Sequence, residues 1–139
     1  MNYLLDTCVL SEFTRRKPDV NVIRWVDNIA EDNTFLSVIT IGEIQRGIER
    51  LSDSQRKNEL TLWLNKGLVE RFAQRILPLD NQTMLLWGSM GARTEKSALP
   101  LAVMDALIAA TALRNNLVLV TCNVSDLLTC GVQMANPWS

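Results

Sequence analysis

The sequence contains no histidine and only three cysteines, and these absences exclude much of the chemistry that enzymes commonly use. Without histidine there is no Ser-His-Asp or Cys-His nucleophilic site and no zinc site built on imidazole. Cys8, Cys122 and Cys130 are odd in number and contain no Cys-x-x-Cys pair. This spacing argues against both a disulfide framework and a four-cysteine zinc site, so we interpret the three cysteines as buried thiols.

An excess of charge and a long apolar run are also missing. The 14 Lys and Arg residues against 15 Asp and Glu give a formal net charge of −1, which provides no global attraction to nucleic acid. No apolar stretch approaches the ~18 residues of a membrane span, and an acid at position 6 comes too early for a signal peptide. With 139 residues, of which 47% are hydrophobic, the chain suits one domain, residues 1–139. We therefore expect a single cytoplasmic domain that does not associate with membranes.

Short apolar segments alternate with helical patterns along the chain. We expect helices capped by Asp19 and Asp80, one beginning near Thr40, one opened by Ser52 or Asp53, and one from Pro100 to Leu113. Continuous apolar runs such as LVLVT are typical of buried parallel strands. The expected strands are residues 2–5, 34–38, 76–79 and 117–121, with a possible edge strand at 131–134. This alternation predicts an α/β fold: a three-layer α/β/α domain with a mostly parallel central sheet of four to five strands.

Several acids occur in apolar surroundings without a basic neighbour in the sequence. Asp6 follows Leu4-Leu5 at the end of an expected strand, and Glu43 is the only charged residue between positions 35 and 45. Asp105 interrupts the apolar run LAVMDALIAATAL, and Asp126 follows the last expected central strand. Because burying an unpaired carboxylate costs several kcal/mol, these acids require partners.

A divalent cation is the partner that clustered carboxylates most readily accept. Mg²⁺ and Mn²⁺ prefer hard oxygen ligands, and such ions can activate water and stabilise charge on a phosphodiester. We therefore expect a metal site that hydrolyses phosphodiesters, formed by Asp6, Glu43, Asp105 and Asp126. Each acid also has a structural alternative, as a helix cap, a satisfied buried group or a solvated turn residue.

Four segments resemble, in the same order, the motifs of PIN-domain proteins, and the match spans nearly the whole chain. Their acids are Asp6, Glu43, Asp105 and Asp126. The tail, which contains Gly131-Val132 and Asn136-Pro137-Trp138, is typical of the VapC and FitB branch of that family. The four segments are Leu4–Leu10 (LLDTCVL), Ile39–Ile44 (ITIGEI), Met104–Ala110 (MDALIAA) and Leu119–Leu127 (LVTCNVSDL).

The resemblance implies a PIN-like toxin of a VapBC-type toxin–antitoxin pair, acting as a Mg²⁺- or Mn²⁺-dependent ribonuclease. Asp6, Glu43 and Asp105 match the metal-binding acids of the family. The fourth position is open between Asn123 and Asp126, and we favour Asp126 as an outer ligand. Supporting roles then fall to Thr7, Thr121 and Asn123.

Two departures from the family pattern leave an alternative open. Cys8 stands where the family usually has Asn, and Cys122 stands where Arg is frequent. Together with Asn123, Cys8 favours the alternative that the chain is a catalytically silent PIN-like binding module acting through its partner. A haloacid-dehalogenase-type phosphatase would require a second acid at position 8, which is Cys8.

The resemblance also implies partners: a cognate VapB-like antitoxin, an RNA substrate and a second copy of the chain. Arg15, Arg16 and Lys17 are candidate RNA contacts, and the scarcity of aromatic residues favours a structured RNA such as tRNA over stacking along a single strand. An antitoxin segment is expected in a groove near Phe13 and Ile48, with DNA bound only indirectly through the antitoxin. The homodimer is expected to use the later helices, with Trp87 as a candidate anchor or core residue.

Overall fold

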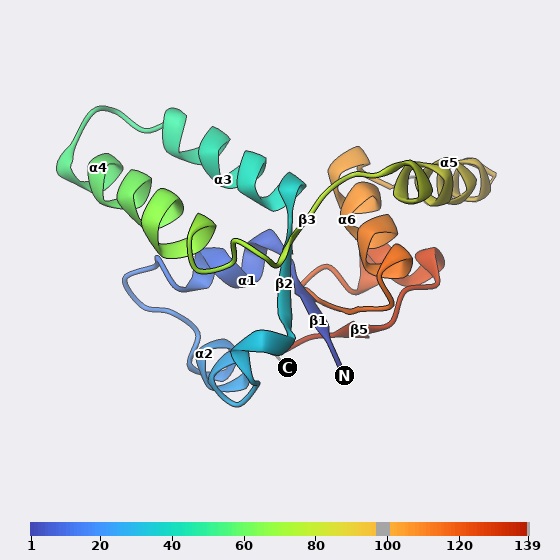
Figure 1. Cartoon of the computed structure of the whole chain (residues 1–139), viewed down its shortest axis with the longest axis horizontal. Coiled ribbons are helices and arrows are strands. Elements are labelled where there is room, and N and C mark those ends of the chain that lie inside the picture. The colour runs from blue at the N-terminus through green and yellow to red at the C-terminus, as the bar shows by residue number, and fades with distance from the viewer. Residues whose placement is uncertain (97–100, 139) are drawn as a thin grey trace.

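The computed structural model describes residues 1–96 and 101–138. Within these residues, five parallel strands form one sheet in the order β3-β2-β1-β4-β5, with β1 at its centre (Figure 1). Tyr3 of β1 lies opposite Thr34 of β2 and Val118 of β4, which fixes the register of the three inner strands. The strands are β1 (Tyr3–Leu5), β2 (Thr34–Ser37), β3 (Ile76–Leu77), β4 (Val118–Val120) and β5 (Met134–Ala135).

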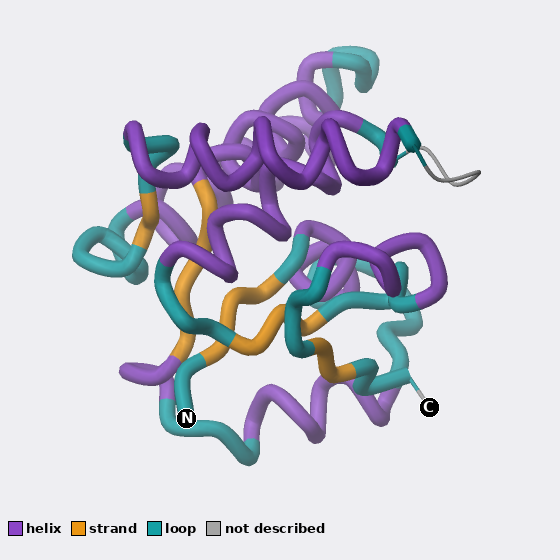
Figure 2. The backbone as a smooth tube through the Cα atoms, turned by 90° about the vertical axis from the view of Figure 1, so that its right-hand side faces the viewer, coloured by secondary structure: helices purple, strands orange, loops and turns teal. Residues whose placement is uncertain are grey.

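Helices connect the strands and cover both faces of the sheet (Figure 2). The helices before β3 are α1 (Thr7–Glu12), α2 (Val20–Asp27), the 3₁₀ turn η1 (Glu31–Asn33), α3 (Val38–Glu49), α4 (Gln55–Leu62) and the π-helix η2 (Trp63–Val69). The later ones are α5 (Asn81–Glu95), α6 (Val103–Arg114) and the 3₁₀ helix η3 (Ser125–Cys130). None of the helices in residues 1–96 and 101–138 has both the length and the apolar character needed to cross a membrane.

Neighbouring residues of each inner strand pack into two different cores. Leu4 and Leu119 pack with α5, α6 and η3 on one face, whereas Leu5 and Val120 pack with α1, α2, α3 and η2 on the other. Successive side chains of a strand point to opposite faces, so a strand covered on both sides is apolar at every position. The predicted three-layer α/β/α fold with a parallel sheet is therefore confirmed.

Two of the predicted helix caps are present in the structure. Asp19 and Asp80 are the N-caps of α2 and α5, as predicted, and their side chains accept hydrogen bonds from backbone N–H groups of the first turn. The expectation that Ser52 or Asp53 opens the next helix was wrong. The hydroxyl of Ser54 accepts the N–H of Lys57 at 3.2 Å, while Asp53 pairs with the Lys57 ammonium at 3.4 Å.

The helix predicted to begin at Pro100 begins at Val103 in the structure, and Pro100 itself lies outside the described residues. This later start places Asp105 in the first turn of α6. A negative charge is favourable there because the free N–H groups of a helix N-terminus carry a partial positive charge. Asp105 therefore lies at the N-terminus of α6, where the helix itself favours a negative charge.

Candidate active site

Asp6 is held in a fixed orientation at the carboxyl end of the central strand. Its backbone N–H donates to the carbonyl of Val120 at 3.0 Å, which continues the pairing of β1 with β4. One carboxylate oxygen accepts the N–H of Thr7 at 2.7 Å, and the other accepts the hydroxyl of Thr121 at 2.7 Å. Only 4% of the residue is exposed. Asp6 is therefore a buried carboxylate with both oxygens oriented by donors.

Glu43 is linked to the same strand end through Thr7. The hydroxyl of Thr7 donates to Oε1 of Glu43 at 2.7 Å and lies 3.0 Å from the hydroxyl of Thr40. Thr40 precedes Glu43 by three residues, so both lie on one face of α3. This network joins the start of α1 to α3. Sequence analysis did not single out Thr40, although its spacing from Glu43 was a usable signal.

The pKa of Asp105 depends on the charges of the other three acids. Its half-buried position is the first cause that raises its pKa, and the negative charges of Asp6, Glu43 and Asp126 raise it further. Like charges shift a pKa in this way only when they lie near one another. Asp105 therefore lies close enough to Asp6, Glu43 and Asp126 for their charges to act on it.

The pKa of Asp6 is raised as well, because burial disfavours its charged form more than the hydrogen bonds from Thr121 and Thr7 favour it. Within residues 1–96 and 101–138, no three His, Cys, Asp or Glu side chains come close enough together to ligate one ion as they stand. Mg²⁺ commonly binds through one or two carboxylates and retains several waters. An all-oxygen cluster with excess negative charge fits such a hydrated ion.

The turn after β4 contributes the remaining predicted residues. The hydroxyl of buried Thr121 accepts the N–H of Asn123 at 3.0 Å while donating to Asp6. Asp126 lies in the first turn of η3 and is exposed, whereas Asn123 is half-buried. Thr121 thus connects the turn to the central acid, and Asp126 lies at the outer side of the cluster.

The cysteines do not all match the expectation of buried thiols. Cys130 is buried and Cys8 is half-buried, but Cys122 is exposed on the turn after β4. The Cys8 sulfur accepts the N–H of Cys122 at 3.4 Å and lies 3.9 Å from the Thr121 hydroxyl. Burial and the negative charge of Asp6 raise the pKa of the Cys8 thiol far above its usual range. Cys8 is therefore a neutral group beside the acids.

Replacing Thr121 by Val should destabilise the protein and weaken the site. The variant keeps the shape of the side chain but removes a donor from Asp6 and leaves the N–H of Asn123 without its acceptor. An unsatisfied buried polar group costs about 1–3 kcal/mol, so the free energy of unfolding in urea should fall by that amount. Thr121→Ser, which retains the hydroxyl, is the matched control. Equal stabilities for the two variants would contradict the role assigned to this hydroxyl.

Comparison with known proteins agrees with this architecture. The family model described as "PIN domain" matches residues 3–125, so the chain belongs to the PIN-domain family. It is 32% identical to "Toxin FitB" of Neisseria gonorrhoeae, with 97% of each chain covered. It is 28% identical to "VapC ribonuclease Y4jK" of Sinorhizobium fredii, with 97% of this chain and 96% of the relative covered.

Among solved structures, the chain resembles a protein in the "Structure of FitAB bound to IR36 DNA fragment". The TM-score is 0.94 at 30% sequence identity, and the alignment covers 99% of this chain and 96% of that one. The strand order and the helices on both faces of the sheet are therefore those of a PIN domain along nearly the full length of the chain.

Proposed function

We propose that this chain is the toxin of a VapBC-type toxin–antitoxin pair and a divalent-metal-dependent ribonuclease. The observation that carries the proposal is the hydrogen-bonded network in which Thr7 donates to both Asp6 and Glu43, with the charges of these two acids also raising the pKa of Asp105. Its place at the carboxyl ends of β1 and β4 is where open parallel sheets usually bind ligands. The relatives named toxin and VapC ribonuclease support the same function.

In this proposal, Asp6, Glu43 and Asp105 bind Mg²⁺ or Mn²⁺, with Asp126 as an outer ligand. Such an ion supplies an activated water and stabilises negative charge on the phosphodiester. The protein's own contribution is orientation, because Thr121 and the N–H of Thr7 hold the two oxygens of Asp6. The Thr7 hydroxyl donates to Oε1 of Glu43, and Oε2 is the oxygen proposed to face the ion.

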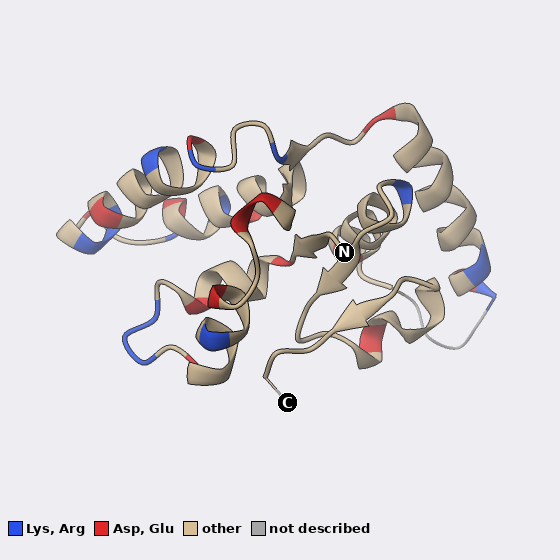
Figure 3. Ribbon diagram, turned by 60° about the horizontal axis from the view of Figure 1, so that its bottom comes forward, with Lys and Arg blue, Asp and Glu red and all other residues tan. Residues whose placement is uncertain are grey.

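RNA is the proposed substrate although the chain has a formal net charge of −1. Figure 3 shows Lys and Arg interspersed with Asp and Glu along the helices. Arg15, Arg16 and Lys17 are all exposed on the loop that follows α1, the helix capped by Asp6. Contacts from these side chains to the phosphates of the RNA suit a folded RNA better than a long single strand. A tRNA is an example of such a folded RNA.

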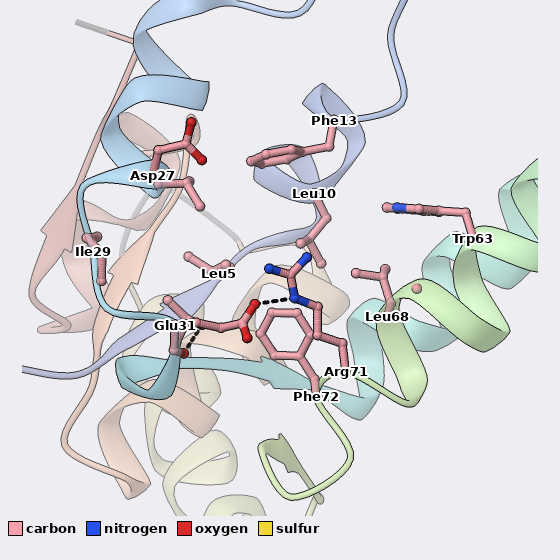
Figure 4. A pocket seen from close by; sticks show the side chains of 13 residues that line it. Leu5, Leu10, Phe13, Asp27, Ile29, Glu31, Trp63, Leu68, Arg71 and Phe72 are labelled. Atoms are coloured by element: carbon pink, nitrogen blue, oxygen red, sulfur yellow. Dashed lines mark hydrogen bonds and ion pairs between the residues drawn. The ribbon is translucent and has the colours of Figure 1, made fainter.

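A cavity of about 350 Å³ is the proposed seat of an antitoxin segment (Figure 4). Phe13 and Trp63 provide apolar surface, while Asp27 and Glu31 can receive basic side chains, and Glu31 already pairs with Arg71. The expected groove thus lies near Phe13. Ile48 is a buried core residue and does not line the cavity. Contact with DNA is proposed to run only through the antitoxin, in line with the DNA-bound FitAB complex.

A homodimer is proposed to form through the later helices. Leu85 on α5 and Val103 at the start of α6 are 61% and 57% exposed, and Met104 beside it is 45% exposed. Trp87 is partly buried and packs against the core formed with α6. We therefore assign it to the core and not to the dimer contact. Because its substrate is RNA and its partner an antitoxin, the protein is proposed to act in the cytoplasm.

Metal removal tests the proposed function. Purified chain free of any partner, incubated with total RNA, should produce discrete fragments with Mg²⁺ or Mn²⁺ and none after EDTA is added. Sequencing of the fragment ends would identify the substrate. If folded protein, verified by circular dichroism, cleaves nothing with either metal, the silent binding module replaces the ribonuclease.

A further inference from the structure

Two cysteines from distant parts of the sequence lie together at the edge of the acidic cluster. Cys8 is in the first turn of α1, and Cys122 is on the turn after β4. They become neighbours because β1 and β4 are adjacent parallel strands, with Leu5 opposite Val120. Cys8 accepts the backbone N–H of Cys122 at 3.4 Å, whereas the Cys122 thiol donates to Oδ1 of Asn123 at 3.5 Å.

This geometry places the Cys8 sulfur beside the backbone of Cys122. A backbone N lies about 1.46 Å from its own Cα, so the Cys8 sulfur is less than about 5 Å from the Cα of Cys122. Because the Cys122 side chain is exposed, rotation about its Cα–Cβ bond can turn its sulfur toward Cys8. Cys122 is exposed and Cys8 is half-buried, whereas Cys130 is buried in the core formed with α6. An oxidant can therefore reach Cys122 first, with Cys8 directly behind it.

We propose that Cys8 and Cys122 form a reversible disulfide on exposure to a peroxide, and that this modification lowers the activity of the adjoining site. The formation of the disulfide is independent of the proposed ribonuclease, whereas the effect on activity rests on it. The neighbouring acids favour a small uncharged oxidant over an anionic one such as oxidised glutathione.

The reaction balances with one peroxide per disulfide. The Cys122 sulfur attacks a peroxide oxygen, the O–O bond breaks, and a sulfenic acid and one water form. The Cys8 sulfur then attacks the Cys122 sulfur, the S–O bond breaks, and the departing hydroxide leaves as water with the proton of the Cys8 thiol. The two thiols lose two electrons and the peroxide gains them.

The disulfide would constrain the turn that holds the central acid. The S–S bond would join the turn after β4 covalently to α1 and take the Cys122 sulfur away from its hydrogen bond to Oδ1 of Asn123. Thr121 and Asn123, on either side of Cys122, would then be held by a covalent link that the reduced protein lacks. Thr121 orients Asp6 at 2.7 Å, and a displacement of about 1 Å in a catalytic site can cost about a hundredfold in rate.

The test compares oxidised and reduced full-length protein. After treatment with hydrogen peroxide, intact mass should fall by two hydrogens, and digestion should yield a peptide that links Cys8 to Cys122. Dithiothreitol should reverse both changes. RNA cleavage by the oxidised protein should be at least about tenfold slower than by the reduced protein, a conservative fraction of the cost expected for a displaced site.

Cys122→Ser and Cys130→Ala are the matched variants, each compared with itself before and after oxidation. Cys122→Ser should form no internal link and should show the same rate in both states, whereas Cys130→Ala should behave like the unmodified chain. If the linked peptide forms but the rate of RNA cleavage does not change, the proposal that the disulfide lowers activity is wrong. Sulfinic acid at Cys122, or a link only between two chains, overturns the disulfide itself. Absence of cleavage in the reduced protein counts against the proposed ribonuclease and leaves the mass result to be judged separately.

Discussion

Asp105→Asn should lower metal-dependent RNA cleavage by at least about a hundredfold while the protein stays folded. Residues that merely support metal ligands typically contribute about 10–100-fold, so loss of a proposed ligand should exceed that range. The substitution keeps the size of the side chain but removes a charge that interacts with Asp6 and Glu43. Initial rates with RNA at several Mg²⁺ and Mn²⁺ concentrations measure the effect.

Asp53→Asn is the matched control, because the Asp53 side chain is fully exposed and pairs only with Lys57 among the contacts found for it. This variant should cleave RNA like the unmodified chain. If Asp105→Asn retains full activity with either metal, Asp105 is not a ligand. The half-buried carboxylate would then act only by stabilising the N-terminus of α6.

The same substitution should change how stability depends on pH in the metal-free protein. The pKa of Asp105 is raised in the folded state, so the folded protein binds more protons than the unfolded chain between the unfolded value, about 3.9, and the raised one. Its free energy of unfolding therefore falls as pH rises through this window. Asp105→Asn lacks this contribution, although it also forfeits a favourable position at the helix N-terminus.

Urea unfolding in EDTA at a series of pH values tests this sign. The stability of Asp105→Asn relative to the unmodified chain should increase as pH rises above about 3.9 and level off above the raised pKa. Asp53→Asn should show no such trend. A relative stability that falls with rising pH would mean that Asp105 has a favourable partner in the folded protein, which contradicts a cluster of repelling acids.

The candidate acids stand out in the sequence because they break an apolar pattern. Asp6, Glu43 and Asp105 are isolated charges in segments that otherwise build the core, and an unpaired carboxylate in such a segment requires a function or a partner. The strands were predictable for a related reason, since residues such as those of β4 are apolar at every position. A charge inside an apolar segment and a strand that is apolar at every position can both be recognised from the sequence alone.

The partners of those acids were harder to predict, because they depend on which strands are neighbours. The contact between Cys8 and Cys122 requires β1 and β4 to be adjacent, and the contact between Thr7 and Thr40 requires α1 to pack near α3. The exposure of Cys122 follows from its place on a turn, although cysteine as a residue type is usually buried. The π-helix Trp63–Val69 likewise continues α4 directly, and the apolar spacing of this segment is the same as that of an ordinary α-helix.

Leu119→Ala should be the most destabilising single substitution considered for this chain. Leu119 lies at the middle of β4, is completely buried and packs in the core that contains Leu4, Met90 and the buried face of α6. Truncating a buried leucine to alanine costs about 2–5 kcal/mol, because apolar contacts are lost and a cavity remains. The free energy of unfolding, measured with urea in the presence of EDTA, should fall by this amount.

Leu128→Ala is the matched control, because Leu128 is the same residue type but is 66% exposed on η3. It should change stability by no more than about 0.5 kcal/mol. The core substitution should also affect the site, since β4 positions Thr121 directly after its last residue and Thr121 orients Asp6. Leu119→Ala should therefore reduce RNA cleavage at temperatures below its unfolding transition, whereas Leu128→Ala should not. Equal stability of the two variants would contradict the packing of Leu119 in the core.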